Sequence, residues 1–490
     1  MNRQRLFTLV LVPIFLFFLL SLTNLKSQYS FKEDPARDTL ASLRILRSKE
    51  ITMIGPPLSL GQNGLRETYF SSAIYYLGAL GLFVSGGSPT GPVVFIALIN
   101  ASALIPLFLI LEKRKYSDVN IFLIMLLYVT NPIVINYSRI LWNPSPLIGI
   151  GMWGVYAFSR SPIIFGLIGG LALYFHYFGV LMFMSGVALY VKEKKYIWFW
   201  KATFAFVVSL APFLFFEFRN EFYLTQSFFY NIQNAPGSEF LAEKLHILVT
   251  LPAVLLGVSS DFFGARLIDL TKYSTTVGLL LWIAFVIFHL KSWSSIFFYS
   301  AVFLTVVASK DMVRLQYLFI GIGGLMALCI PKLQKTGTYI VIFLIAIQSV
   351  NTLYSIRQPA HIFGGQEFPT TTQLEEARSL IIDSHVSGKK FNITENITGD
   401  ARAGYLRFFF ENDQTLAIAD LQNELSYENL DELYVLTPSV NKTMTERRWE
   451  LTATSGLKLV SSQDVGVYKL LKYVRAEDEE SGSDYLKMSK

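Results

Sequence analysis

The chain has 490 residues, a net charge of +6 and one cysteine; 52% of its residues are hydrophobic and 16% are charged. Soluble globular proteins carry about 25% charged residues, so this composition excludes a soluble fold for the whole chain. A single cysteine excludes an intramolecular disulfide. Basic residues clustered in loops between apolar runs do not indicate nucleic-acid binding.

The chain divides by composition into three parts. Residues 1–355 hold almost all the long apolar runs, residues 357–474 read as a soluble domain, and the acidic tail 475–490 is expected to be disordered. A surrounding bilayer accounts for an apolar part of this length better than a soluble core does. The predicted fold class is therefore a polytopic α-helical membrane protein with a C-terminal α/β soluble domain.

A helix needs about 20 residues to cross the hydrocarbon of a bilayer, and fewer where the bilayer is thin. The apolar runs predict about eleven spans of this kind. They cover residues 6–25, 91–111, 119–137, 144–159, 162–175, 178–191, 196–216, 275–290, 293–308, 314–330 and 338–354. The first run lacks a small-residue cleavage site, so we interpret it as a retained span. The apolar stretches 69–87 and 246–260 are expected to be re-entrant or interfacial.

Positive charge predicts the orientation, because lysine and arginine accumulate in cytoplasmic loops. Four basic turns fall on the side of the N-terminus if the two ambiguous stretches do not cross the membrane. These turns contain Lys113–Lys115, Lys192–Lys195, Lys291, and Lys332 with Lys335. The C-terminal domain and loop 26–68 then lie outside, in a protein of the plasma membrane. Loop 26–68 breaks the charge rule with seven lysines or arginines, which indicates a use for its charge.

The start of this outer loop is acidic and reads Phe31-Lys32-Glu33-Asp34-Pro35-Ala36-Arg37-Asp38. Ser30 and Glu33 have the spacing of a capping box, so a helix start explains Glu33 better than catalysis does. The apolar positions that follow recur at helical spacing among arginines, which predicts an amphipathic helix in the membrane interface. For Asp34 and Asp38, composition alone leaves a structural and a functional interpretation equally open.

The pattern Asp34-x-x-Arg37-Asp38, followed by Gly55-Pro56-Pro57, Tyr69 and Tyr75-Tyr76, resembles the first outer loop of the GT-C glycosyltransferases. The resemblance is to bacterial and archaeal members similar to protein O-mannosyltransferases and aminoarabinose transferases. It covers residues 1–355, whereas the C-terminal domain carries no family motif. Many relatives have a second acid where Pro35 stands here.

Two later motifs are also similar to the family. Arg139-x-x-Trp142-Asn143-Pro144 lies at the outer end of a span, and His176-Tyr177 ends another. From the residues alone, Arg139 equally fits snorkelling at a span end, and Trp142 better fits an interfacial aromatic. His176 alone is more typical of a helix-packing donor than of a base or ligand.

The resemblance implies a catalytic base at Asp34, with Arg37 orienting it and Asp38 positioning the acceptor or a metal. Basic side chains of the outer face would hold the donor phosphate, namely Arg314 with Tyr317, Arg66 and Arg139. Sugar or acceptor would meet Glu67, Tyr69, Trp142, Asn143 and His176. Arg314 alone would equally fit a snorkelling cation. Some relatives use a divalent ion, so Mg²⁺ or Mn²⁺ stays open, and no cofactor is otherwise implied.

The implied activity is that of an inverting glycosyltransferase that moves a mannose-like hexose from a polyprenyl-phosphate donor to an acceptor hydroxyl. The acceptor could be lipid, glycan or protein. One firm carboxylate suits inversion, whereas a retaining hydrolase needs a close pair. A transporter or flippase of sugar-lipid substrates is the main alternative, but it would carry inverted repeats or charges at mid-membrane. A sugar-lipid polymerase or ligase would place its large loop late in the chain.

Helix-like and strand-like runs alternate in the C-terminal domain. The patterns predict helices over 372–386 and 400–411 and strands over 389–394, 414–419, 432–437 and 465–473. No glycine-rich phosphate loop and no nucleophile motif accompany them. Asn392, Asn396 and Asn441 fit the glycosylation acceptor pattern, as chance allows in a polar domain.

Overall fold

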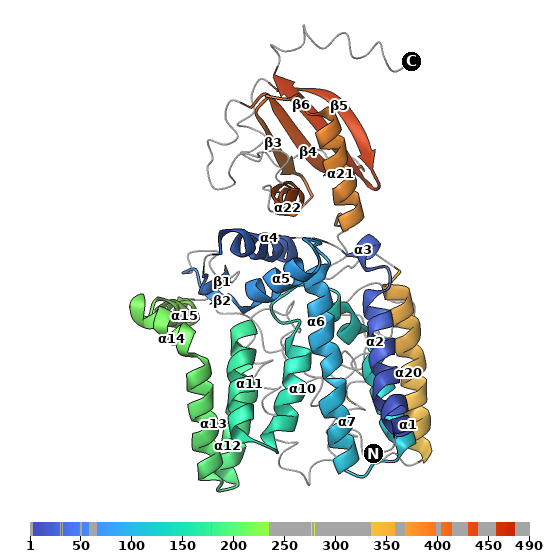
Figure 1. The fold of residues 1–490 in the computed structure, drawn as a ribbon, viewed down its shortest axis with the longest axis vertical. Helices are drawn as coiled ribbons and strands as arrows, with labels where there is room; N and C mark the ends of the chain where they lie inside the picture. Colours follow the sequence, from blue (N-terminus) through green and yellow to red (C-terminus); the bar gives the residue numbers. More distant parts are fainter. Residues whose placement is uncertain are drawn as a thin grey trace. The chain divides into compact units, whose positions relative to one another are not determined.

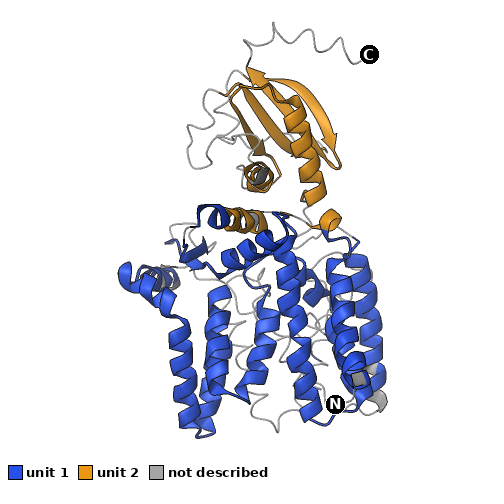
Figure 2. Cartoon of the chain, in the orientation of Figure 1, with its two compact units in different colours: residues 1–25, 44–366 blue, residues 26–43, 367–490 orange. Residues whose placement is uncertain are grey.

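The computed structural model describes residues 3–29, 31, 33–49, 51–57, 66–177, 179–234, 276, 279, 335–357, 368–397, 403–413, 430–439 and 457–475. The chain forms two compact units (Figure 2). Unit 1 comprises residues 1–25 and 44–366, and unit 2 comprises residues 26–43 and 367–490. The first part of the predicted outer loop therefore groups with the C-terminal part of the chain.

Unit 1 contains the apolar helices (Figure 1). Its described helices are α1 (Arg3–Leu6), the π-helical turn η1 (Phe7–Leu11), α2 (Val12–Leu22), α5 (Ala73–Val84), α6 (Gly91–Ser102), α7 (Leu104–Lys113), α8 (Asp118–Val129), α9 (Pro132–Ser138), α10 (Leu147–Phe158), α11 (Pro162–Phe175), α12 (Gly179–Lys192), α13 (Tyr196–Ser209), α14 (Ala211–Arg219), α15 (Tyr223–Asn234) and α20 (Lys335–Ser355). Within the described ranges, Gln4–Leu22 and Gly91–Lys113 are long and apolar enough to cross a membrane. They correspond to the first two predicted spans.

Two further predicted spans are bent pairs of helices. The axes of α8 and α9 differ by 54°, and those of α13 and α14 by 59°. Asn131 caps α9 by accepting a hydrogen bond from the Ile133 backbone N–H at 2.9 Å, and Pro132 cannot donate the bond that would continue α8. Spans 119–137 and 196–216 are thus broken, which hydropathy alone does not reveal.

Four shorter apolar helices match the remaining spans that the structure describes. The predicted spans 144–159, 162–175, 178–191 and 338–354 correspond to α10, α11, α12 and α20. The predicted spans 275–290, 293–308 and 314–330 and the stretch 246–260 lie outside the described residues, apart from Thr276 and Leu279. The total of eleven spans stays a prediction.

The ambiguous stretch 69–87 forms a strand and a short helix. Strand β2 (Tyr69–Ser71) pairs antiparallel with β1 (Ile54–Pro57), and α5 runs across the end of α6 in Figure 1. The 12 residues of α5 rise about 18 Å, less than the roughly 30 Å of hydrocarbon. This length agrees with the expectation that the stretch does not cross fully.

Two of the four predicted basic turns lie in the described residues and share one end of the unit 1 helices, whereas Lys291 and Lys332 lie outside those residues. The Arg5 guanidinium pairs with Glu112 at 2.8 Å and with Asp118 at 2.9 Å, beside the Lys113–Lys115 turn. The α12–α13 turn, which contains Lys192–Lys195, lies at the same end in Figure 1. This distribution is the one that the positive-inside rule requires, while the side of the membrane itself stays a prediction.

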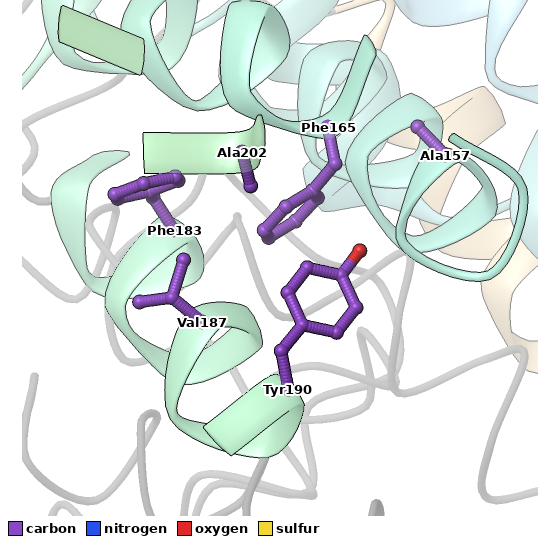
Figure 3. Packing of buried hydrophobic residues seen from close by; sticks show 6 residues of the cluster. All are labelled: Ala157, Phe165, Phe183, Val187, Tyr190 and Ala202. Carbon is purple, nitrogen blue, oxygen red and sulfur yellow. The ribbon is translucent and has the colours of Figure 1, made fainter. Parts of the chain in front are cut away.

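Aromatic and aliphatic side chains join α10, α11, α12 and α13 in a close-packed core (Figure 3). It contains Ala157, Phe165, Phe183, Val187, Tyr190 and Ala202. Glycines let the backbones approach: a Cβ at Gly166 would lie 2.2 Å from the Ala202 carbonyl oxygen, and one at Gly170 would lie 1.7 Å from Ser209 Oγ. Gly169 and Gly170 are thus sites of close helix packing.

Unit 2 contains a mixed four-stranded sheet of order β3–β4–β6–β5. Strand β3 (Phe391–Glu395) is parallel to β4 (Glu432–Pro438), and β6 (Tyr468–Arg475) is antiparallel to β4 and to β5 (Leu457–Val465). Helices α21 (Thr371–Ser384) and α22 (Gly404–Asp413) pack against each other.

The strands predicted over 389–394, 432–437 and 465–473 and both predicted helices are found, whereas 414–419 lies outside the described residues. Strand β5 was not predicted, because its polar, exposed residues 461–464 break the apolar alternation. Asn392 is fully buried and accepts a hydrogen bond from Arg407, so this acceptor-pattern match has a structural role.

Segment 26–43 is held within unit 2 by backbone and ring contacts. The segment includes most of α3 (Leu25–Gln28) and the start of α4 (Glu33–Ser48). The Thr371 N–H donates to the Tyr29 carbonyl at 3.2 Å, and the Phe31 N–H donates to the Pro369 carbonyl at 3.4 Å. The Phe31 ring meets that of Phe408 at 5.4 Å. The segment that leads into α4 thus belongs to the fold of unit 2.

Candidate functional site

The three predicted catalytic residues lie together on the first turns of α4. Arg37 Nη1 lies 2.8 Å from Asp34 Oδ1, and Arg37 Nη2 lies 2.8 Å from Asp38 Oδ1. Asp34 lies three residues before Arg37, at a helical spacing that lets their side chains meet, and the adjacent Asp38 reaches the same guanidinium. Pro35 suits the first turn, where its missing N–H costs no helical hydrogen bond. The arrangement is a row in which one arginine bridges two carboxylates.

The two carboxylates of this row have different surroundings. The Asp34 side chain is 42% exposed, whereas that of Asp38 is 0% exposed. Burial raises the pKa of Asp38 to about 7, because Arg37 offsets only part of the desolvation. Asp38 Oδ2 has no hydrogen-bond partner within the described residues. The exposed Asp34 is therefore the carboxylate that a substrate can reach, and Asp38 is a buried support.

The raised pKa of Asp38 predicts a pH-dependent stability. A carboxyl whose folded pKa lies above its unfolded value stabilises the fold at low pH, and this contribution is lost as the pH rises from about 4 to 7. Asp38→Asn, which mimics the protonated acid, should remove that loss. Its unfolding free energy relative to the natural chain should rise between pH 5 and 8, by about 3 kcal/mol at most. Thermal unfolding across this range checks it, and a pH-independent difference would contradict it.

A second group of predicted residues gathers in unit 1 around β2. The Tyr69 hydroxyl donates to Glu67 Oε2, and the Tyr177 hydroxyl donates to the Tyr69 carbonyl. The hydrogen bond to Glu67 is the main reason that the pKa of Tyr69 rises to about 12. Arg66 precedes this pair and directs its guanidinium over the Tyr230 ring, at 4.7 Å from the centroid. Arg66, Glu67 and Tyr69 thus form a polar strip at the start of β2.

His176 lies next to this strip, at the end of α11. Its ring lies 4.9 Å from that of Phe70, between the centroids, and it is 3% exposed. Ser71 Oγ donates to the Tyr174 carbonyl at 2.6 Å, which joins β2 to the same helix end. The structure therefore brings His176 to the predicted sugar or acceptor residues of β2, in a packed environment that also suits the structural alternative.

Arg139 is tied to the end of the first span. Its Nη1 donates to the carbonyls of Leu20, Ser21 and Thr23, at 3.3, 2.9 and 2.8 Å. These are the carbonyls that the end of α2 leaves without helical partners. Burial lowers the pKa of Arg139 to about 10, so the side chain stays charged at neutral pH. These contacts account for Arg139 without a phosphate.

Arg139→Leu should therefore act on folding more than on ligand binding. Losing charged hydrogen bonds to buried carbonyls should cost about 1.5–3 kcal/mol of unfolding free energy. The affinity of the folded protein for a polyprenyl phosphate should change less than threefold, about 0.6 kcal/mol. Thermal unfolding and lipid binding, measured on the same preparation, check this expectation. A large loss of affinity with unchanged stability would restore the donor-phosphate role.

Of the other predicted ligand residues, two are buried and two lie outside the described residues. Trp142 is 8% exposed with its ring 5.8 Å from that of Tyr137, which favours packing. Asn143 is 4% exposed, and its Oδ1 has no hydrogen-bond partner within the described residues. Arg314 and Tyr317 lie outside those residues. Their predicted roles stay predictions.

Within the same described ranges, no group of three or more histidine, cysteine or acidic residues could hold a metal ion. The Asp34 and Asp38 carboxylates converge on an arginine, which is a cation already. The divalent ion considered from the sequence stays an open prediction.

Sequence reasoning missed one residue that the structure brings to the polar strip of Arg66, Glu67 and Tyr69. Asn231 of α15 makes two hydrogen bonds to the backbone of Arg66, at 2.8 and 2.7 Å. The two residues are 165 positions apart, and no local pattern distinguishes Asn231 from other polar residues of its helix. Only the tertiary pairing identifies it.

Comparisons with known proteins find similar structures. No family model matches the sequence, and no curated protein matches it. The structure of ArnT from Cupriavidus metallidurans in the apo state matches with a TM-score of 0.60 and 10% sequence identity, over 95% of this chain and 97% of that one. The same protein bound to undecaprenyl phosphate matches with a TM-score of 0.57, at the same identity and coverage. The similarity covers both units.

Proposed function

We propose that this polytopic membrane chain, whose fold is that of the GT-C glycosyltransferases, is an inverting glycosyltransferase. The resemblance expected from the first outer loop is confirmed at the level of the fold. The proposed reaction moves a mannose-like hexose from a polyprenyl-phosphate donor to an acceptor hydroxyl. The observation that carries the proposal is the Asp34–Arg37–Asp38 row on the helix that follows the first span.

Asp34 is the proposed general base. As the acceptor oxygen attacks the anomeric carbon, its proton passes to the Asp34 carboxylate. The bond from the anomeric carbon to the phosphate oxygen breaks, and that oxygen keeps the electron pair. Attack from the face opposite the phosphate inverts the configuration and needs one base only. Arg37 holds one oxygen of Asp34 at 2.8 Å and so limits how the carboxylate can turn.

The leaving group is a lipid phosphate that needs cations and no proton. The sugar donor is a phosphodiester with one negative charge. When the lipid phosphate leaves as a monoester, the negative charge on its oxygens increases. Arginine stabilises such oxygens through two parallel N–H donors. Among the described residues, Arg66 is the proposed phosphate ligand. It is exposed, and its guanidinium contacts the Tyr230 ring and pairs with no acidic side chain of the described part of the chain. Arg314 with Tyr317 stays a second proposed contact.

The undecaprenyl phosphate bound to ArnT in one of the similar structures supports a polyprenyl-phosphate ligand here. Glu67 and Tyr69 share the strip with Arg66 and His176 lies beside it, so these three residues are proposed to meet the sugar or the acceptor. We further propose a plasma-membrane protein whose active site and C-terminal domain face outward. The acceptor is a lipid, a glycan or a protein.

A transporter or flippase of sugar-lipid substrates is the competing function. The two functions differ in whether the donor is consumed. Purified protein in nanodiscs, which have no second compartment, should convert one member of a panel of polyprenyl-phosphate hexoses to free polyprenyl phosphate when a candidate acceptor is supplied. The result for a transporter would be different. The protein would bind a donor but consume none with any acceptor tested, and it would move the lipid across the membrane of proteoliposomes.

A further inference from the structure

We propose that Asn231 is a positioning residue that holds Arg66 toward the phosphate of a polyprenyl-phosphate ligand, an inference that rests on the proposed function. Asn231 Oδ1 accepts from the Arg66 backbone N–H at 2.8 Å, and Asn231 Nδ2 donates to the Arg66 carbonyl at 2.7 Å. One side-chain amide thereby satisfies both backbone groups of Arg66, as a neighbouring strand would. The peptide that carries the guanidinium is fixed to α15.

The side chain of Arg66 is directed by the residue before Asn231. Its guanidinium lies over the Tyr230 ring, at 4.7 Å from the centroid. A ring face attracts a cation yet leaves the edge of the guanidinium, with its N–H donors, free for an anion. Asn231 thus sets the backbone and Tyr230 sets the direction of the charged group, from adjacent positions of one helix.

The helix that supplies both contacts is itself anchored. Glu217, which is 2% exposed at the end of α14, accepts from the backbone N–H groups of Leu224 and Thr225, at 3.0 Å each. A carboxylate there satisfies donors that the first turn of α15 leaves open and suits the helix dipole. Asn231 therefore holds Arg66 to an element whose start is fixed, which is what a positioning role requires.

The surroundings of α15 fit a lipid ligand. Phe215 and Phe218 of α14 and Phe228 and Phe229 of α15 are between 47% and 67% exposed. Exposed phenylalanines on helices at the end of a membrane span are typical of a surface that contacts the acyl chains next to the headgroups. Two buried hydroxyls, Ser227 Oγ on α15 and Thr68 Oγ1 two residues after Arg66, have no hydrogen-bond partner within the described residues. An arginine held at this depth meets lipid phosphate.

The test is a double-mutant cycle on the binding of undecaprenyl phosphate to purified full-length protein, with undecaprenol as the neutral probe. Arg66→Gln should weaken the phosphate lipid about 10–100-fold. Asn231→Ala should weaken it about tenfold in the natural chain and less than about twofold in the Arg66→Gln background, because it acts through the guanidinium. Gln226→Ala, an exposed amide on α15, is the matched control and should leave binding unchanged.

A second pair of variants, at Tyr230, distinguishes a specific loss of phosphate binding from a general loss caused by misfolding. Tyr230→Phe keeps the ring face and should bind normally, whereas Tyr230→Leu should weaken the phosphate lipid and not the alcohol. Equal losses from Asn231→Ala in both backgrounds, or equal losses for both lipids, would overturn the positioning role and leave the proposed function standing. A natural chain that binds the phosphate no better than the alcohol would overturn the proposed function as well.

Discussion

Asp34→Asn is expected to reduce sugar transfer about 10²–10⁴-fold, the usual contribution of a general base. The amide has almost the same shape as the carboxylate but cannot take the acceptor proton. Because the Asp34 side chain is 42% exposed, its replacement should leave folding and membrane insertion unchanged. Donor consumption under saturating donor, with lipid binding measured in parallel, separates the loss of chemistry from the loss of binding.

A matched control exists at the start of α8. Asp118 is also an exposed acid paired with an arginine, Arg5, at 2.9 Å. Asp118→Asn should change neither transfer nor binding beyond twofold, about 0.4 kcal/mol. If the Asp34 variant kept more than a tenth of the natural rate, the base would have to be another group.

Arg37→Gln is expected to damage both stability and transfer. It removes the arginine that pairs with Asp38, which is 0% exposed, and an unsatisfied buried group costs about 1–3 kcal/mol. The double variant Arg37→Gln/Asp38→Asn should recover most of that stability, because no buried carboxylate is left unpaired. Transfer should stay at least tenfold low in both, about 1.4 kcal/mol, since Asp34 is no longer held.

Thermal unfolding and initial rates of the two variants distinguish a catalytic support from a folding support. Recovery of stability without transfer is the expected result. Recovery of both together would mean that Arg37 matters only because it neutralises Asp38, and the positioning of Asp34 would have to be explained differently.

The apolar runs and the short acidic motif carried most of what could be predicted. As a helix, the run 91–111 rises about 31 Å and so matches the hydrocarbon layer of a bilayer, which is why this helix follows from length and hydropathy. Asp34, Arg37 and Asp38 could be placed together because helical spacing is a local property. The breaks at Asn131–Pro132 and near Pro212 were locally visible too, yet bilayer hydropathy averages over them.

Tertiary partners could not be predicted, because no pattern within a segment encodes them. The sequence around Arg139 does not distinguish a side chain that caps α2 from one that binds phosphate. Its three hydrogen bonds to backbone carbonyls favour the capping role. Asn231 looks like any polar residue of an amphipathic helix until its pairing with Arg66 is seen. The placement of segment 26–43 with unit 2 likewise depends on contacts such as that of Phe31 with Phe408.

The stereochemistry of a single transfer tests the account most directly. Purified protein, one anomer of the reactive polyprenyl-phosphate hexose and an acceptor should give a product of the opposite anomeric configuration, resolved by NMR before the product can exchange. A site with one base and a lipid-phosphate leaving group predicts inversion in every turnover. A product of retained configuration, or none from any donor, would contradict it.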